Sequence, residues 1–278
     1  MSDRPEFLKP KLFIGSKKDV FLWLFSGLAL LAMLYFLFPL LALGWRALAL
    51  YSSQGVISQQ QLLSSLWLSL QTTAISVAVI FMVGTPLAYA FSFYRFPFKS
   101  VISVVVELPV VMPPVVAGLA LLAAFGRRGV LGSAFEVIGI SIPFTTAAVV
   151  MAQVFIAAPF YIRTVQNRFS HLPAELEEAA QIDGASPAQT FFAVILPLSG
   201  RAMLSGLLLS WARALGEFGA TILFAGNLQG TTRTMPLLVY SALERDFGAT
   251  YFTASILLVM AAVVFVVVRR LAHLDESR

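Results

Sequence analysis

The chain has 278 residues, of which 59% are hydrophobic and 12% are charged, and its formal net charge is +5. Soluble domains are about 45–50% apolar and about 25% charged, so this composition excludes an ordinary soluble globular protein. The absence of cysteine excludes disulfides and thiolate metal sites, and the two histidines, His171 and His273, lie far apart in the sequence. The composition therefore predicts an all-α integral membrane protein that holds no metal.

Six apolar segments are each long enough to cross a bilayer as a helix, which takes roughly 20 residues. They lie at about 20–44, 66–93, 101–125, 144–167, 199–224 and 250–270. With the N-terminus inside, thirteen lysines and arginines fall in inner segments and five in outer segments, while Arg213 lies within a span. The positive-inside rule then predicts that residues 1–19, the loop 168–198 and the tail 271–278 are cytoplasmic, around one transmembrane domain of residues 20–270.

The first apolar segment follows Lys17, Lys18 and Asp19, as the apolar part of a secretory signal peptide can. That part of a signal peptide is usually 7–15 residues long and is followed by a small-residue cleavage site. Here the apolar run exceeds 20 residues, and no Ala-x-Ala site follows at a suitable distance. The pattern favours a retained membrane anchor.

The third apolar segment contains three prolines, Pro109, Pro113 and Pro114. Each proline removes a backbone donor and crowds the preceding turn, and Met112 and Pro113 are pushed out of the helical region by the proline that follows. The sequence therefore predicts a broken or strongly kinked helix. Either a hinge that lines a pore or a packing kink would account for it, because a membrane tolerates such a break where protein or water satisfies the freed carbonyls.

The segment 172–197 is the one long polar and acidic stretch between two apolar segments. It holds four of the fourteen acidic residues within nine positions: Glu175, Glu177, Glu178 and Asp183. A small apolar face, made of Leu176, Ala179, Ala180 and Ile182, suits a helix that presses into a groove of a partner. Either a docking hairpin or an ordinary cytoplasmic loop fits the composition, and the orderly helix caps favour docking.

Local signals divide this segment into two short helices. The first is expected over 174–182, with Pro173 at its first position, and Gly184 can adopt the left-handed conformation that ends it. The second is expected over 187–195. Ser186 and Gln189 have the spacing of a capping box for it, and we expect it to stop before Pro197.

Two charges lie inside the fifth apolar segment. Arg213 is about mid-bilayer and Glu217 follows one turn later, and each would cost roughly 2.5–3.5 kcal/mol or more in contact with lipid. Their i,i+4 spacing allows them to pair on one face. Either a structural ion pair or a gate for a dianion fits them, and Glu107 is a second candidate partner for Arg213 or simply an interfacial acid.

The chain has no Gly-x-x-x-x-Gly-Lys-Ser/Thr phosphate loop, so we expect it to bind no ATP and no other cofactor. An ion-coupled secondary transporter would show paired discontinuous helices and more intramembrane acids. The sequence indicates one broken segment and one clear charge pair. No pattern of an intramembrane enzyme is present, since metalloprotease and nucleophile-elbow motifs are missing.

The run Glu178-Ala179-Ala180, with Gly184 four residues later and Ile195-Leu196-Pro197 beginning eleven residues beyond it, resembles the EAA motif. That motif marks the permease subunits of binding-protein-dependent ABC importers. The runs Leu108–Gly118, Gly126–Gly129 and Arg213–Thr221 are similar to the sulfate, molybdate and tungstate branch, and more to its molybdate permeases. Together the resemblance covers roughly residues 60–270.

The resemblance implies the type I ABC importer permease fold, in which 172–197 is the coupling hairpin. It implies ATPase coupling for nine residues: Glu177, Glu178, Ala179, Ala180, Asp183, Gly184, Ile195, Leu196 and Pro197. The residues expected on the translocation path or at its gate are Glu107, Pro109, Pro113, Pro114, Arg213, Gly216 and Glu217.

The partners that the resemblance implies are a second permease chain, usually identical in the molybdate-like branch, and two ATPase subunits that carry ATP and Mg. An extracytoplasmic binding protein would deliver molybdate or tungstate, with sulfate or thiosulfate as the alternative. The setting would be the inner membrane of a bacterial or archaeal cell, and no nucleic acid is expected as a partner.

Overall fold

The computed structural model describes residues 18–50 and 57–274. The predicted cytoplasmic segment 1–19 lies almost wholly outside the described residues, as does the end of the predicted tail 271–278. Within the described ranges all regular secondary structure is helical, and there is no β-strand.

Twelve α-helices and one π-helix follow one another in these ranges. They are α1 (Lys18–Ala49), α2 (Gln59–Phe93), α3 (Lys99–Val111), α4 (Pro114–Phe125), α5 (Gly132–Val137), α6 (Thr146–Ser170), α7 (Ala174–Ile182), α8 (Pro187–Thr190), η2 (Phe191–Ile195), α9 (Leu196–Leu215), α10 (Gly219–Phe224), α11 (Met235–Leu243) and α12 (Phe247–Leu274).

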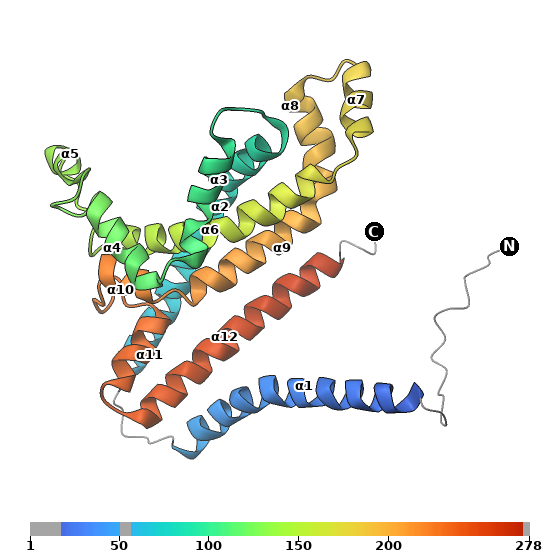
Figure 1. Cartoon of the computed structure of the whole chain (residues 1–278). Coiled ribbons are helices and arrows are strands. Elements are labelled where there is room, and N and C mark those ends of the chain that lie inside the picture. Colours follow the sequence, from blue (N-terminus) through green and yellow to red (C-terminus); the bar gives the residue numbers. More distant parts are fainter. Residues whose placement is uncertain (1–17, 51–56, 275–278) are drawn as a thin grey trace.

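Five helices in the described residues are long and apolar enough to cross a membrane (Figure 1). They are α1, α2, α6, α12 and the continuous helix Pro187–Leu215 that joins α8, η2 and α9. The third predicted span, 101–125, is instead made of α3 and α4, which have 13 and 12 residues. Neither reaches the roughly 20 residues that one crossing requires.

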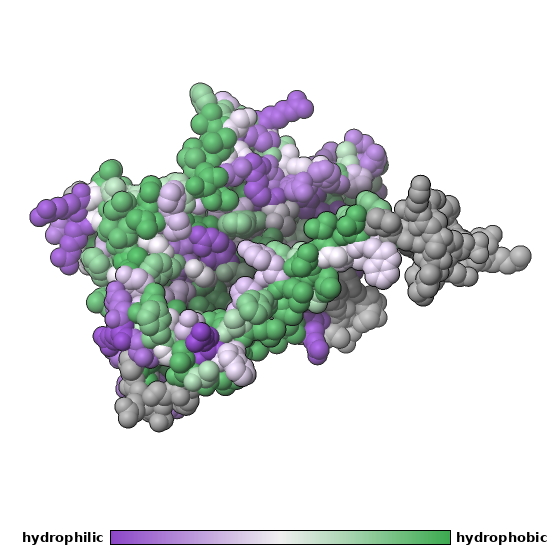
Figure 2. All heavy atoms as spheres, turned by 60° about the horizontal axis from the view of Figure 1, so that its bottom comes forward, coloured by the Kyte–Doolittle hydropathy of each residue, from purple (hydrophilic) through white to green (hydrophobic). Residues whose placement is uncertain are grey.

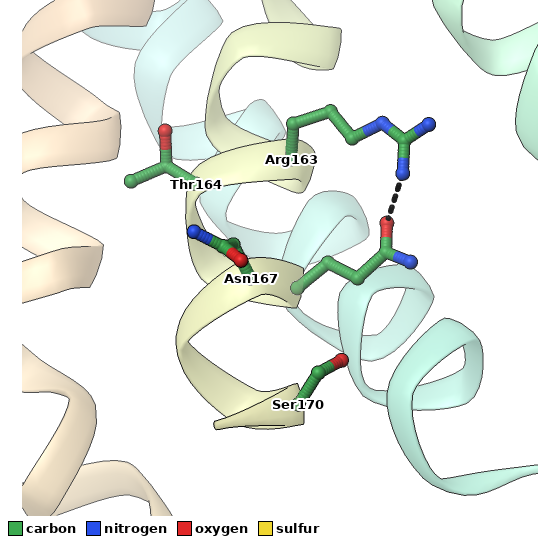
Figure 3. A pocket seen from close by; sticks show the side chains of 5 residues that line it. Arg163, Thr164, Asn167 and Ser170 are labelled. Carbon is green, nitrogen blue, oxygen red and sulfur yellow. Dashed lines mark hydrogen bonds between the residues drawn. The ribbon is translucent and has the colours of Figure 1, made fainter. Parts of the chain in front are cut away.

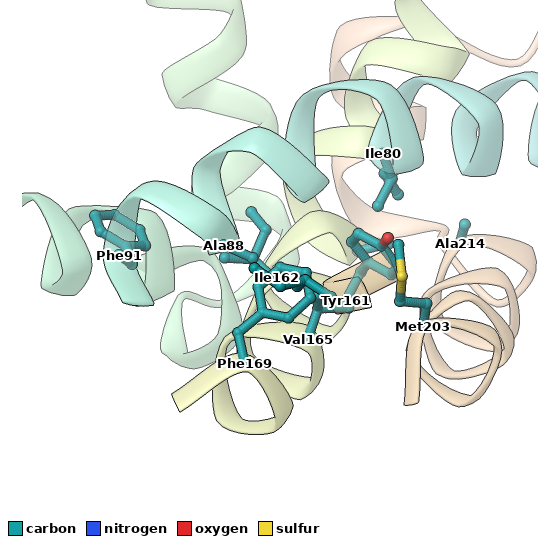
Figure 4. Packing of buried hydrophobic residues seen from close by; sticks show 11 residues of the cluster. Ile80, Ala88, Phe91, Tyr161, Ile162, Val165, Phe169, Met203 and Ala214 are labelled. Atoms are coloured by element: carbon teal, nitrogen blue, oxygen red, sulfur yellow. The ribbon is translucent and has the colours of Figure 1, made fainter. Parts of the chain in front are cut away.

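The core of the molecule is the packing of α6 against α2 and α9, and Tyr161 lies at its centre (Figure 4). A Cβ added to Gly84 of α2 would lie 2.8 Å from the Tyr161 ring, and one added to Gly206 of α9 would lie 3.1 Å from it. The two glycines therefore let the helices approach on both sides of the ring. The Tyr161 hydroxyl is 2.6 Å from the Thr85 hydroxyl, so its polar end is satisfied within the core.

A second buried connection links α2, α6 and α11 through polar side chains. Gln153 of α6 accepts from Ser76 at 2.8 Å and donates to Thr72 at 3.2 Å, both on α2. Ser69, one turn before Thr72 on α2, accepts from the backbone N–H of Met235 at the start of α11 at 2.7 Å. Because these buried groups satisfy one another, they set the register of the three helices.

α1 stands apart from this core and packs mainly along α12 (Figure 1). Its side chains are almost all exposed within the chain, for example Trp23 at 78% and Leu48 at 81%. Figure 2 shows hydrophobic residues over much of one face of the molecule, between hydrophilic patches. So large an apolar surface requires lipid or another apolar chain around it.

Candidate functional site

The polar segment forms a hairpin of α7 and α8 beyond the joined ends of α6 and α9 (Figure 1). Gly184 has φ +81°, the left-handed conformation that we expected at the end of the first helix. The predicted capping box is confirmed. The Gln189 backbone N–H donates to the Ser186 Oγ at 3.3 Å, and the Ser186 N–H donates to the Gln189 Oε1 at 2.8 Å. Pro173 precedes α7 as its N-cap and does not occupy the first helical position.

No residue of α7 is buried within the chain. Ile182 is 86% exposed and Leu176 is 40% exposed, so the small apolar face has no cover inside this protein. The predicted coupling residues Glu178, Ala179 and Asp183 are exposed on the same short helix and turn. This hairpin is ordered by its caps and open to a partner.

The prediction that the second helix stops before Pro197 is wrong. The helix continues from α8 through η2 into α9, with Ile195 buried and Pro197 in the first turn of α9. Proline lacks a backbone N–H, and its ring crowds the carbonyl four residues earlier. The π-turn at Phe191–Ile195 admits an extra residue just before this point, so the helix accommodates the proline without ending.

The predicted break in the third apolar segment is confirmed. α3 ends at Val111, Met112 and Pro113 take extended conformations with ψ of 136° and 131°, and α4 begins at Pro114. Pro109 remains inside α3 and is buried.

A second break, at Gly216–Phe218, was not predicted. The fifth apolar segment was expected to be continuous over 199–224, but α9 ends at Leu215 and α10 begins at Gly219. The side chain of Glu217 turns back and accepts from the Ala220 N–H at 2.8 Å. It thereby satisfies one of the free donors at the start of α10, as an N-terminal cap does. In the sequence, the signal for this break was the presence of Gly216 and Gly219 on either side of Glu217.

The two breaks lie side by side. A Cβ added to Gly219 would lie 2.7 Å from the Pro114 Cβ, and one added to Gly118 would lie 2.9 Å from the Leu223 Cβ. α4 and α10 therefore pack closely over their first two turns, and the described part of the chain has a pair of discontinuous helices where the sequence indicated one.

Arg213 and Glu217 pair as predicted, with 2.8 Å between Nη1 and Oε2. The Glu217 side chain is fully buried, whereas that of Arg213 is 29% exposed. The Glu217 carboxylate therefore has two partners: one oxygen caps the start of α10, and the other forms the ion pair with Arg213.

Glu107 does not pair with Arg213, the candidate partner that the sequence suggested. It forms an ion pair with Arg163 of α6, and Ser103 donates to the same carboxylate at 3.2 Å. Arg213 is thus not its partner. The sequence could not indicate this pair, because Glu107 and Arg163 belong to helices that are distant along the chain.

Arg163 belongs to a group of polar residues on the last two turns of α6, which we call the α6 polar stripe (Figure 3). It lines an open cavity of about 520 Å³ and consists of Arg163, Thr164, Gln166, Asn167 and Ser170. Arg163 donates to Gln166 at 3.1 Å. Apart from the charge of Arg163, none of these residues was singled out from the sequence.

At the end of the molecule away from the hairpin, the loop before α11 holds Arg233 and Asn227 together (Figure 1). Arg233 donates to the Asn227 side chain at 2.8 Å and to its backbone carbonyl at 3.2 Å. Burial lowers the pKa of Arg233, and the neighbouring Arg245 lowers it further. Arg245 is exposed between two acidic residues, Glu244 and Asp246. No cluster of potential metal ligands occurs among the residues that the structure describes.

Comparison with known proteins decides the family. Residues 80–276 match the family described as binding-protein-dependent transport system inner membrane component. The chain belongs to this permease family. The permease is thus a multi-pass inner-membrane transport component, and its described part contains five helices suited to membrane crossing.

Several relatives of the permease are similar over most of their length. It is 41% identical to the molybdenum transport system permease protein ModB of Mycobacterium bovis, over 72% of this chain and 76% of the relative. It is 37% identical to the probable transport system permease protein NifC of Clostridium pasteurianum, over 88% and 86%. It is 36% identical to the sulfate transport system permease protein CysW of Synechococcus elongatus, over 80% and 78%.

The fold of the permease also matches solved transporters. A chain of a bacterial alginate ABC transporter, in complex with a periplasmic protein that binds an alginate pentasaccharide, superposes with a TM-score of 0.69. The sequence identity is 19%, and the match covers 92% of this chain and 94% of the other. This similarity concerns the fold alone.

Proposed function

We propose that the permease forms the translocation path of an ATP-driven importer for a tetrahedral oxyanion, molybdate or tungstate. Two copies would make the path, and two separate ATPase subunits would carry ATP and Mg. An extracytoplasmic binding protein would deliver the anion. Sulfate or thiosulfate is the second candidate substrate, favoured by the similarity to the sulfate permease CysW.

The observation that carries this proposal is the hairpin. α7 exposes its apolar face and its acids, although capped ends and the left-handed Gly184 hold it in one conformation. An ordered surface without a partner inside the chain is what a docking element requires. Since the sequence has no phosphate loop, the energy source must be another subunit, and this hairpin is its point of contact.

The continuous helix Pro187–Leu215 supports a coupling role for the hairpin residues. Ile195, Leu196 and Pro197 lie where the hairpin passes into α9, and α9 leads to the break at Gly216. One helix therefore connects the docking hairpin of α7 and α8 to the paired helix breaks. This supports Glu107, Pro109, Pro113, Pro114, Arg213, Gly216 and Glu217 as path or gate residues.

The orientation that we propose has the hairpin and both termini in the cytoplasm of a bacterial or archaeal cell. The count of positive charges supports it. In Figure 1 the start of α1, the end of α12 and the hairpin all lie toward the right, which agrees with one side for all three. The end near Arg245 would then face the binding protein.

The oxyanion is supported by the relatives and by the electrostatics of the breaks. The positive charge of Arg213 attracts an anion, and the buried Glu217 cancels much of that charge. Weak net attraction suits passage better than tight binding. The paired breaks are also a feature of secondary transporters, but the family match and the hairpin favour the ATP-driven class.

The test is transport by a reconstituted complex. The permease is co-expressed with its neighbouring ATPase and binding protein, and the complex is placed in liposomes with ATP inside. We expect ATP-dependent uptake of molybdate, competed by tungstate more strongly than by sulfate. Stronger competition by sulfate would favour the second candidate, and equal uptake by the permease without any ATPase would overturn the proposal.

A further inference from the structure

The last two turns of α6 have two chemically opposite faces. One face is buried in the core against α2 and α9, and it includes Ile162, Val165 and Phe169 (Figure 4). The other face carries the α6 polar stripe, whose members Arg163, Gln166, Asn167 and Ser170 recur at helical spacing. Such a face is costly against lipid, so it must adjoin water or another protein surface.

The stripe consists mainly of hydrogen-bond donors. The guanidinium of Arg163 has five N–H groups in a planar fork, and the amides of Gln166 and Asn167 add two each. The Asn167 side chain makes no hydrogen bond to any described residue, and Gln166 uses only its oxygen, toward Arg163. Free donors next to a guanidinium are the groups that bind the oxygens of a tetrahedral anion.

Glu107 already occupies the position that such an anion would take. Its carboxylate pairs with Arg163, and the Arg163 and Glu107 side chains are 48% and 35% exposed. The pair therefore stands in contact with the solvent, where ion pairs are weak and exchange readily. Glu107 belongs to α3, the helix that ends at the proline break, so a shift of α3 relative to α6 would change the competition for Arg163.

We propose that the α6 polar stripe is an exit site for the transported oxyanion, and that Glu107 is the internal anion that displaces it from Arg163. This inference rests on the proposed function. The cavity of about 520 Å³ has room for roughly seventeen waters at about 30 Å³ each, so the oxyanion keeps much of its hydration shell there. Loose binding and a built-in competitor both favour release.

The experiment uses the absence of native cysteine in this chain. Asn167→Cys is made in the full complex with the ATPase, and inside-out vesicles expose the proposed cytoplasmic face. We expect a negatively charged, membrane-impermeant thiol reagent to modify the N167C thiol, and molybdate to slow this modification several-fold. Val263→Cys, at a 55% exposed apolar position of α12, is the control and should not react, because its thiol faces lipid.

Glu107→Gln, combined with Asn167→Cys, tests the competitor. Removing the carboxylate should let molybdate protect the thiol at about tenfold lower concentration, which corresponds to about 1.4 kcal/mol. Ser170→Cys is the second reporter and is used if Asn167→Cys fails to assemble.

The outcomes separate this inference from the proposed function. If the wild-type complex transports molybdate but the anion never protects either thiol, the exit site is wrong and the importer stands. If both thiols are unreactive from inside, the stripe is a covered contact between chains, and the inference is wrong as well. Protection that Glu107→Gln leaves unchanged would overturn the role of Glu107. Absence of ATP-dependent uptake by the wild type would instead contradict the proposed function.

Discussion

Gly219 of α10 lies so close to Pro114 of α4 that a Cβ on the glycine would stand 2.7 Å from the Pro114 Cβ. This contact joins the two helix breaks of the permease. Gly219→Ala should therefore force the breaks apart and lower the free energy of unfolding by about 1–3 kcal/mol, the usual cost of overpacking. Thermal unfolding of the purified permease in detergent measures the loss.

Gly200→Ala is the matched control, because no atom lies within 4 Å of a Cβ at that position. In the helix interior it should be neutral or stabilising by about 0.5–1 kcal/mol. Equal unfolding temperatures for the two variants would contradict the close approach of α4 and α10.

Gly184→Val should leave membrane insertion intact and uncouple ATP hydrolysis from transport. The left-handed backbone at φ +81° costs a residue with a Cβ roughly 1–2 kcal/mol, although the space around it is open. The expected loss comes from the backbone of the hairpin and not from a clash. Parallel assays of ATP hydrolysis and molybdate uptake measure the ratio of the two.

Gly184→Asn distinguishes the backbone from other effects, because asparagine tolerates the left-handed region. We expect coupling close to that of the wild type in this variant. Unchanged transport in Gly184→Val would count against the docking role of the hairpin.

Arg213→Ala should destabilise the assembled permease, because it leaves the buried Glu217 carboxylate without its counter-charge. Breaking a fully buried pair costs about 3–5 kcal/mol, and the partial exposure of Arg213 reduces the expected loss to about 2–3 kcal/mol. Yield from membranes and the unfolding temperature in detergent measure it.

The double variant Arg213→Ala with Glu217→Gln should recover part of that stability. Glutamine keeps an oxygen that can cap the Ala220 N–H and removes the unpaired charge. No recovery would mean that the pair stabilises through packing, and normal stability of Arg213→Ala alone would mean that the pair contributes little.

Tyr161→Phe should lower the free energy of unfolding by about 1 kcal/mol, since it removes the buried hydrogen bond to Thr85. In a double-mutant cycle with Thr85→Val, the second substitution should cost less once the first is present. Additive losses would show that the two hydroxyls do not interact energetically.

Local signals explain which parts of this structure the sequence could predict. The prolines of the third apolar segment force a break, and Ser186, Gln189 and Gly184 have cap and turn preferences that act within a few residues. These features appeared as expected. The break at Gly216 was not predicted, because glycine permits a break without requiring one. The close packing of α10 on α4 determines that the helix ends there.

Features that depend on packing between distant parts of the chain could not be predicted from local signals in the sequence. The sequence predicts a stop at Pro197, but burial of residues such as Ile195 favours continuation of the helix, and a π-turn accommodates the proline. The pairing of Glu107 with Arg163 depends on how α3 lies against α6, which no spacing in the sequence encodes.

The π-turn before Pro197 leaves a single helix of 29 residues from Pro187 to Leu215. At 1.5 Å per residue it is about 44 Å long. Tilting such a rod by 5° about its middle would move each end by about 2 Å, comparable to the helix shifts that switch other proteins. A displacement of α8 therefore tilts the whole helix and moves its other end at Gly216. The stiffness of the helix backbone, more than a series of side-chain contacts, determines how far that end moves.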